Sequence, residues 1–429
     1  MCTICESGRV PGGPGKPQPV RFAADGTRRR TGRGGTGMEQ GSGDARWMGV
    51  GRSTGDDSRA AAVEAARAAV TGPEPKLLLV FAAITHDPAL IQEGIREVAG
   101  DAPVLGCTTH GEIGPGGPAD GSVVVAALGG PGFSVATAVA EQVSGRQREA
   151  GVEVAGCAAQ VADRAYRVLF LLTDGLTRDQ ESILRGCYAA LGAGVPLFGG
   201  AAADGWRMTG TYLMADGKVL TDAVVAATIA SDAPIAVSVR HGYHKIGEPM
   251  IVTSAANGRV HTLDDRPAMD VYLERLGAPA GAYTDLDSFV EFALPRPIGV
   301  QRRSGVEARN VSTEIDLAGR SIGGGSALDP GGLAWVMDGD EGSILDAVDE
   351  ACREARERLG GQPPIGMLTF SCAALRAVLG EDGIRREGDR LDRAAAGTPF
   401  AGFYTYGEIA RTRGIDGFHN QTLVVLALA

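Results

Sequence analysis

Positive charge, aromatic side chains and long apolar runs are all scarce in this sequence of 429 residues. The 52 acidic side chains outnumber the 41 basic ones, and the resulting formal net charge of −11 argues against nucleic acid as the main partner. Aromatic residues make up only 5% of the chain. No apolar run reaches the roughly 18 residues that a transmembrane helix needs, so we expect no membrane partner.

A disulfide framework and the common catalytic motifs are also missing. The seven cysteines are dispersed and odd in number, which predicts a reducing, cytoplasmic location. Cys2 and Cys5 form a single C-x-x-C without a second pair, which is weak evidence for zinc. The sequence contains no G-x-x-x-x-G-K-[ST] and no H-E-x-x-H. We therefore expect no metal, no cofactor and no catalytic residue, and we predict that the protein is not an enzyme.

Glycine, by contrast, is abundant, with 64 residues. Residues 1–47 are rich in glycine, arginine and proline and contain too little apolar surface to offset the entropy that folding would cost. We predict a disordered tail over this range. Met38 and Met48 both precede the first sequence that is typical of ordered structure, and we hypothesise that the natural protein starts at one of them.

From residue 48 onward, a unit of strand, helix, strand, turn and strand recurs. Its copies begin with continuous apolar runs, typical of strands buried on both faces, at 76–84, 167–172 and 365–370. The turn segments 103–113 and 399–409 share Pro, Gly, Thr, Gly, Glu and Ile at fixed offsets, whereas 196–205 lacks the Gly-Glu pair. An internal duplication explains this similarity.

The repeat predicts an α/β fold of two related halves, built from duplicated strand-helix-strand-turn-strand units, with mixed sheets flanked by helices. We place the N-terminal domain at 48–245 and the C-terminal domain at 246–429. Composition, helical spacing of apolar residues and start signals predict helices at 58–70, 88–98, 177–191, 267–276 and 344–359. Short strands are predicted around 289–293 and 311–317.

The two Gly-x-x-Thr-x-Gly-Glu-Ile turns carry the best candidate chemistry. Each follows an apolar strand, and open α/β sheets bind ligands at strand ends. Glycine lets backbone N–H groups approach an anion, while Glu112 and Glu408 supply the opposite charge, which suits an amino acid or another small zwitterion. The alternative interpretation is a hairpin turn in which the glutamate bonds its own backbone.

Two cysteines and an aspartate lie at or just past the ends of predicted strands. As nucleophiles, Cys107 and Cys372 need a base, and His110 and His419 are available in the sequence. The alternative for both cysteines is a small, half-buried apolar side chain. Asp174 either points into the same crevice or only shapes its turn.

These segments resemble the FIST family (F-box and intracellular signal transduction), sensory proteins with homologous N- and C-terminal domains. The motifs that carry the resemblance are Gly106-Cys-Thr-Thr-His-Gly-Glu-Ile113, Leu263-Asp-Asp-Arg-Pro-Ala268, Phe370-Ser-Cys372, Ala401-Gly-Phe-Tyr-Thr-Tyr-Gly-Glu-Ile409 and His419-Asn-Gln-Thr422. The resemblance covers 48–429. It implies a signal-input protein that binds small ligands, with amino acids as the family-level suggestion, and a haem-containing, nitric-oxide-sensing branch is also known.

The sequence departs from the family pattern in three respects. Leu375 stands where the family has an arginine three residues after the Phe-Ser-Cys cysteine, and Arg376 follows it. Asp265 replaces the usual glycine of Asp-Gly-Arg-Pro-Ala. No kinase, cyclase or methyl-accepting module accompanies the two domains, so we expect signalling to pass through a separate protein partner.

We therefore predict a stand-alone cytoplasmic sensor of a small polar ligand, an amino acid or a related metabolite. Three alternatives stay open. They are a haem-dependent nitric-oxide sensor, which hemin binding would reveal, a cysteine-dependent acyl-transfer or hydrolytic enzyme, which a reactive thiol would reveal, and an architectural partner-binding protein, which would respond to no small molecule. The predicted ligand-binding residues come from the turns and the strand ends; they are Cys107, Thr108, Thr109, Glu112, Asp174, Cys372, Arg376, Tyr404, Thr405, Tyr406, Glu408, His419 and Asn420.

Overall fold

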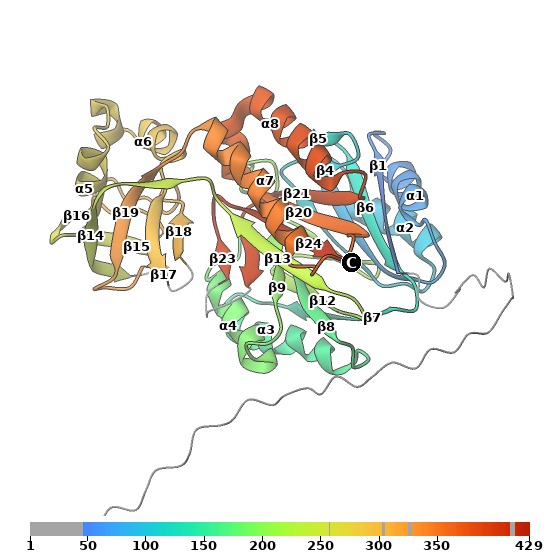
Figure 1. Cartoon of the computed structure of the whole chain (residues 1–429). Helices are drawn as coiled ribbons and strands as arrows, with labels where there is room; N and C mark the ends of the chain where they lie inside the picture. Colours follow the sequence, from blue (N-terminus) through green and yellow to red (C-terminus); the bar gives the residue numbers. More distant parts are fainter. Residues whose placement is uncertain (1–45, 257, 303–304, 325–327, 412–416) are drawn as a thin grey trace, which may run out of the picture. The chain divides into compact units, whose positions relative to one another are not determined.

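The computed structural model describes residues 46–256, 258–302, 305–324, 328–411 and 417–429 (Figure 1). The predicted N-terminal tail lies outside these described residues, except for its last two positions. Among the helices of the described ranges, none is long and apolar enough to cross a membrane.

Four six-stranded sheets form within the described residues, and three of them share one plan. In each of the three, an edge strand pairs antiparallel with the last strand of the repeat. That last strand pairs antiparallel with the apolar strand that opens the repeat, and the opening strand pairs parallel with the strand before the turn. The chain is thus the mixed α/β fold with duplicated units that the sequence predicts.

A two-stranded hairpin completes each of these three sheets. In spatial order, the first sheet contains β1 (Trp47–Ser53), β6 (Val123–Gly129), β2 (Pro75–Ala83), β3 (Val104–Thr109), β10 (Leu213–Ala215) and β11 (Lys218–Leu220). The second contains β7 (Phe133–Glu141), β12 (Ala223–Ser231), β8 (Tyr166–Thr173), β9 (Leu197–Ala201), β22 (Glu408–Arg411) and β23 (Phe418–His419). The third contains β13 (Ile235–Arg240), β24 (Leu423–Leu428), β20 (Gly366–Cys372), β21 (Phe400–Thr405), β4 (Glu112–Gly114) and β5 (Gly117–Ala119).

The hairpins are exchanged around the three sheets. The hairpin β4–β5 follows β3 in the sequence but pairs with β21 of the third sheet. The hairpin β10–β11 follows β9 but pairs with β3 of the first sheet, and β22–β23 follows β21 but pairs with β9 of the second. Each repeat therefore completes the sheet of another repeat, and the exchange closes into a cycle. The two acidic turns lie where the chain crosses from one sheet to the next.

Paired helices cover the outer face of each of these sheets. They are α1 (Ser58–Ala69) and α2 (Pro88–Ala99) on the first, α3 (Gln147–Ala155) and α4 (Gln180–Leu191) on the second, and α7 (Glu341–Glu357) and α8 (Ala373–Ala395) on the third. A short 3₁₀ helix, η1 (Gly156–Ala159), follows α3. Gly380 interrupts α8, because its φ of 62° is incompatible with a continuous right-handed helix.

The helix starts follow the sequence signals with one exception. Asp87 caps α2 ahead of Pro88 by accepting the Ala89 N–H at 2.8 Å. The helix predicted from Thr177 begins later, because the α4 N-cap is Asp179, whose side chain accepts a backbone N–H of the first turn. The Gln180 amide instead donates to the Thr177 carbonyl at 3.0 Å.

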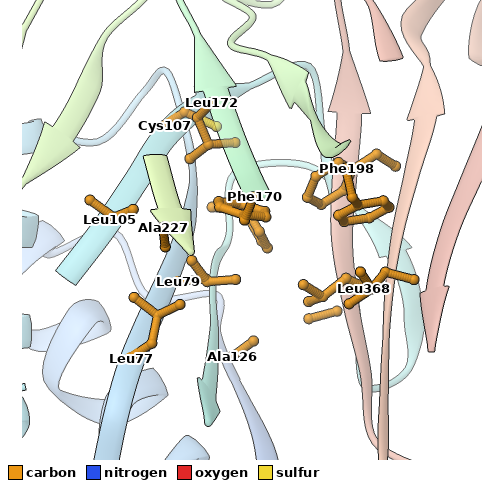
Figure 2. Packing of buried hydrophobic residues seen from close by; sticks show 14 of the residues in the cluster. Leu77, Leu79, Leu105, Cys107, Ala126, Phe170, Leu172, Phe198, Ala227 and Leu368 are labelled. Carbon is orange, nitrogen blue, oxygen red and sulfur yellow. The ribbon is translucent and has the colours of Figure 1, made fainter. Parts of the chain in front are cut away.

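The inner faces of the three sheets meet in one apolar core (Figure 2). The corresponding strands β2, β8 and β20 each contribute a phenylalanine to it: Phe81, Phe170 and Phe370. The ring centroid of Phe370 lies 5.4 Å from that of Phe81 and 6.1 Å from that of Phe170, in edge-on geometry. Figure 2 shows Cys107 among the side chains of this core, together with Leu172.

The fourth sheet is inserted in the sequence between β13 and β20, and all its strand pairs are antiparallel. In spatial order it contains β16 (Arg266–Pro267), β15 (Arg259–Leu263), β14 (His244–Ala256), β19 (Leu333–Asp338), β17 (Ile298–Arg302) and β18 (Gly305–Arg309). Its separate core includes apolar side chains of α5 (Ala268–Arg275), η2 (Ala280–Tyr283) and α6 (Leu286–Ala293).

The short strands predicted in this insert are wrong. Residues 289–293 belong to α6, whose N-cap Asp285 accepts the Ser288 N–H at 2.8 Å. The apolar residues there recur at helical spacing, a pattern that a five-residue window is too short to reveal. Residues 311–317 form no named strand in the described chain, and Asp316 makes only an isolated bridge with Ser321.

Candidate functional site

The first glycine of each repeated turn lets two parallel strands approach closely. A Cβ added at Gly106, Gly199 or Gly402 would lie 2.5, 1.9 or 1.6 Å from a carbonyl oxygen of the neighbouring strand. At Gly111, φ is 120° and an added Cβ would lie 2.0 Å from the guanidinium of Arg376. Backbone packing therefore accounts for these glycines without a bound anion.

The turns of all three repeats meet. The Tyr404 N–H donates to the Gly111 carbonyl at 2.9 Å, and the His110 N–H donates to the Tyr404 carbonyl at 3.0 Å. In the middle repeat, the Ala203 N–H donates to the Thr108 carbonyl at 2.9 Å. The hairpin exchange thus brings together segments that are almost 300 positions apart in the sequence.

Glu112 is fully buried and both its oxygens are hydrogen-bonded. One oxygen accepts the hydroxyl of Thr109. The other accepts the Ser122 N–H at 2.9 Å and the Ser122 hydroxyl at 2.7 Å. Because Ser122 directly precedes β6, the carboxyl group ties the turn to the last strand of the first repeat.

Glu408 makes the same set of bonds in the third repeat. It is 0% exposed, and one oxygen accepts the Thr405 hydroxyl at 2.8 Å. The other oxygen accepts the Thr422 N–H at 3.2 Å and the Thr422 hydroxyl at 2.9 Å. Thr422 directly precedes β24, so the arrangement matches that of Glu112.

Asp174 takes over this role in the middle repeat, which lacks the Gly-Glu pair. Its carboxylate accepts the Asp222 N–H at 2.6 Å, and Asp222 directly precedes β12. The other oxygen accepts the Thr211 hydroxyl at 2.6 Å and the Leu176 N–H at 2.9 Å. The carboxylate comes from the end of β8 rather than from the turn, yet it bonds the corresponding backbone N–H. A structural role, in which the acid holds the backbone just before the last strand of its repeat, therefore accounts for all three groups.

The burial of the two glutamates also opposes capture of an ammonium group. Burial raises the pKa of Glu112 to about 7 and that of Glu408 to about 8, although hydrogen bonds from the neighbouring hydroxyls act in the opposite direction. At neutral pH, Glu408 is therefore mainly an uncharged carboxylic acid. An uncharged acid offers a ligand cation no countercharge.

The cysteines at the strand ends lack the environment of a nucleophile. Cys107 is 0% exposed and Cys372 is 5% exposed. Burial, and then the nearby Glu112 or Glu408, raises the pKa of each thiol well above its usual range. A reactive cysteine needs a lowered pKa and access to solvent, so both side chains stay protonated at neutral pH.

An aromatic cluster lies where the three turns meet, and it contains His110, Trp206 and Tyr406. The Trp206 ring stacks on Tyr406 with centroids 5.4 Å apart and an interplanar angle of 27°. The His110 ring meets Trp206 edge-on at 5.0 Å. Burial, and then the nearby Arg376, lower the pKa of His110 to about 4, so the ring is neutral at pH 7.

The loop that presents Trp206 is held by one buried carboxylate. Asp204, 0% exposed, accepts the backbone N–H groups of Met208, Thr209 and Gly210 at 3.0, 2.8 and 3.1 Å. The Tyr406 hydroxyl donates to the same carboxylate at 2.6 Å and accepts the Trp206 N–H at 2.7 Å. The loop is thus tied both to itself and to the turn of the third repeat.

Two cavities flank this loop. The first, which we call the Trp206 cavity, has a volume of about 420 Å³ and is lined by residues of the α4 start, the α8 start, the insert and the Trp206 loop. The second, the Arg376 cavity, has a volume of about 490 Å³. Trp206 and Met208 line the first cavity, whereas Gly205 and Arg207 line the second.

The predicted site residues divide among these places. Four of them line the Trp206 cavity, and these are Cys372, Thr405, Tyr406 and Asn420. Thr109, Glu112 and Arg376 line the Arg376 cavity, and His419 lines a further cavity of about 450 Å³. The remaining predicted residues are buried, either in the apolar core or in hydrogen bonds within the protein, and these are Cys107, Thr108, Asp174, Tyr404 and Glu408.

Hydrogen bonds show what several of these residues do. The Thr108 hydroxyl accepts the Tyr212 N–H at 3.1 Å. The Tyr404 hydroxyl donates to the buried Glu387 carboxylate. Arg376 donates two bonds to Asp120, at 2.6 and 2.7 Å, so its guanidinium already has an acidic partner.

Residues outside the predicted site complete the Trp206 cavity. Gln180 is 8% exposed, and its Oε1 has no hydrogen-bond partner among the described residues, while its amide nitrogen donates to two carbonyls. Asn310 reaches the cavity from the insert. Trp206 carries a weak sequence signal, since it is one of three tryptophans in the chain and follows Asp-Gly in a turn segment.

Comparison with known families and proteins gives consistent matches. The FIST N domain model matches residues 76–266 and the FIST C domain model matches residues 268–411. An uncharacterized protein of Mycobacterium tuberculosis, Rv0628c, is 26% identical over 389 residues, which covers 87% of this chain and 97% of that protein. An uncharacterized protein of Mycobacterium bovis, Mb0898c, is 25% identical over 387 residues with the same shares covered.

Among solved structures, cyanuric acid hydrolase from A. caulinodans matches with a TM-score of 0.31 and 10% identity, covering 89% of this chain and 99% of that one. Phosphoribosylformylglycinamidine synthase II from Thermotoga maritima matches with a TM-score of 0.20 and 11% identity, covering 89% and 72%. At these scores the likenesses carry no argument about fold or activity.

Proposed function

Because the chain belongs to the FIST family, whose domains are sensory domains of signal transduction, we propose that it senses a small polar ligand bound in the Trp206 cavity. The ligand class we favour is an amino acid or a related metabolite. The proposal places the protein in the cytoplasm and its output in a separate protein partner. The buried glutamates of the repeated turns are not needed for it.

The observation that carries the proposal is a cavity of suitable size that is lined by polar and charged side chains and by the exposed ring of Trp206. Small-molecule sites combine an apolar or aromatic wall with a few polar groups, as this cavity does. The volume of about 420 Å³ falls within the range of small-molecule sites.

The composition of the cavity supports the same ligand class. Its wall carries Asp179, Glu314 and Arg178, and it also carries Glu181, which already pairs with Arg185 at 3.3 Å. Charged groups of both signs therefore suit a ligand that has an ammonium and a carboxylate group. The wall also combines residues from two repeats and from the insert, so a bound ligand would join parts of the chain that are distant in sequence.

A thermal-shift screen with a cavity-blocking variant tests the proposal. The wild-type protein should gain about 2.7 kcal/mol of stability when an amino acid is present at a hundredfold excess over its dissociation constant. Thr313 is exposed and lines the cavity, so Thr313→Trp should abolish the gain without disturbing the core. Thr284, an exposed threonine of the insert away from the cavity lining, provides the control Thr284→Trp, which should keep the full gain.

Two results would contradict the proposal. One is the absence of any stabilisation by a panel of amino acids and related metabolites. The other is a full gain in Thr313→Trp, which would place the ligand outside the Trp206 cavity.

A further inference from the structure

We infer that the ligand of the Trp206 cavity is an amino acid with an aromatic side chain, whose ring packs on Trp206 while its charged groups lie at the start of α4. This inference rests on the proposed function and specifies the ligand class of that site. It starts from the conformation of the Trp206 loop.

The loop holds two large apolar side chains in the open at a cost in backbone strain. Trp206 has a φ of 64° and Met208 a φ of 52°, both in the left-handed region that residues with a Cβ seldom adopt. The two side chains are nevertheless 44% and 55% exposed. Strain of this kind persists where the surrounding structure enforces it and is concentrated at binding sites. In this loop Asp204 enforces it through three backbone N–H groups.

The indole ring is fixed before any ligand arrives. Tyr406 stacks on it, His110 contacts it edge-on, and the backbone N–H of Trp206 donates to the Tyr406 hydroxyl, which fixes the residue that carries the ring. A ring held on one side and still substantially exposed is a preorganised platform, because little side-chain freedom is left to lose on binding. A planar apolar group is its natural partner, since offset stacking adds to the gain from burial.

Apolar neighbours extend the platform. Met208 and Phe418 line the same cavity as Trp206 and Tyr406. A thioether beside an aromatic ring makes favourable contacts with a further ring. A ligand with only polar groups would leave this surface unused.

Charged side chains of the cavity lie near the start of α4, in contrast to the apolar side chains beside Trp206. Asp179 and Glu314 offer acidic groups to an ammonium group, and Arg178 offers a partner for a carboxylate. A single molecule that carries ammonium, carboxylate and an aromatic ring meets all of these requirements. A free aromatic amino acid is the smallest such molecule.

Isothermal titration of the full chain tests the inference. L-phenylalanine, L-tyrosine or L-tryptophan should bind about tenfold more tightly than L-alanine and L-serine, which is the gain expected for one stacked ring. Trp206→Ala should weaken the aromatic ligand about tenfold and change serine binding less than twofold, while Trp206→Phe should keep most of the affinity. Tyr166, an aromatic residue that is 40% exposed on β8, gives the control Tyr166→Ala, which should bind like the wild type.

The outcomes separate the inference from the proposed function. If serine or alanine binds as tightly as phenylalanine, or if Trp206→Ala weakens all ligands equally, the sensor proposal stands and the aromatic assignment fails. Phenethylamine, which lacks the carboxylate, should bind more weakly than phenylalanine; equal binding would overturn the assignment to an amino acid. If no amino acid binds at all, both fail. A melting temperature of Trp206→Phe close to that of the wild type confirms that the variant is folded.

Discussion

Replacing Glu408 by glutamine should stabilise the protein at neutral and alkaline pH, although it removes an ionisable group from a hydrogen-bonded site. Burial raises the pKa of this carboxyl group from 4.5 to about 8 on folding. Below pH 4.5 both the folded and the unfolded chain hold the proton. As the pH rises, the unfolded chain releases it first, so folding becomes less favourable until the folded-state pKa is passed.

The magnitude follows from the size of the pKa change. At about 1.36 kcal/mol per pH unit, a rise from 4.5 to about 8 corresponds to about 5 kcal/mol of stability lost by pH 8. Relaxation around the ionised group reduces this figure, and we expect about 3 to 5 kcal/mol. Glutamine avoids the loss because its carbonyl can accept the bonds from Thr422, while its NH₂ group donates to the Thr405 hydroxyl.

The assay is urea unfolding followed by circular dichroism between pH 5 and 9, with wild type and variants measured side by side. The stability difference between Glu408→Gln and wild type should grow with pH and level off above about pH 8. The matched control is Glu112→Gln, whose difference should level off near pH 7 because that pKa rises only to about 7. Background titrations, including those of the histidines, cancel in these differences.

Two outcomes would refute the reasoning. A stability difference that does not change with pH would show that Glu408 has the same pKa in both states. A wild type that becomes more stable than the variant as pH rises would show that the carboxylate is ionised and held by the Thr422 N–H, with a lowered pKa.

Two further predictions concern Asp174 and the cysteines. Asp174→Ala removes the acceptor of two backbone N–H groups and a hydroxyl, so we expect the free energy of unfolding to fall by about 2 to 4 kcal/mol. The control Asp382→Ala, at an exposed ion pair, should change the free energy of unfolding by less than about 0.5 kcal/mol. Equal losses in the two variants would contradict the role of Asp174. Iodoacetamide at pH 7, with peptide mapping, should leave Cys107 and Cys372 unlabelled in the folded protein and label both in urea; rapid labelling of folded Cys372 would instead favour the cysteine-dependent enzyme.

Much of the secondary structure could be predicted because its signals are local. The buried strands β2, β8 and β20 appear as continuous apolar runs, and α2 begins at an aspartate followed by proline. The repeat itself is visible in the shared residues of two turns. What the sequence could not show is the exchange of hairpins, because strand pairing over hundreds of residues depends on backbone bonds that have no sequence signature.

The site is less predictable than the fold, for a physical reason. Glycine, threonine and glutamate at fixed spacing are equally suited to binding a zwitterion and to holding a turn, and only burial separates the two. The residues that distinguish the Trp206 cavity, among them Trp206 and Gln180, lie outside any repeated motif. Nothing in the sequence distinguishes Gln180, because its burial and its unpartnered oxygen are properties of the folded chain.

The middle repeat shows how a structural role and a binding role can be told apart. It has lost the Gly-Glu pair, yet Asp174 supplies a carboxylate to the corresponding backbone N–H from a different strand. All three repeats keep a carboxylate that bonds the N–H before the last strand, although its residue type and position change. We conclude that the shared architecture requires this bond. The Trp206 loop is the opposite case, since it separates β9 from its hairpin in this repeat, whereas β4 and β22 follow their turns within a few residues. A segment that one repeat alone possesses, and that is held in a strained conformation at a cavity, is where a function specific to the whole chain can be placed.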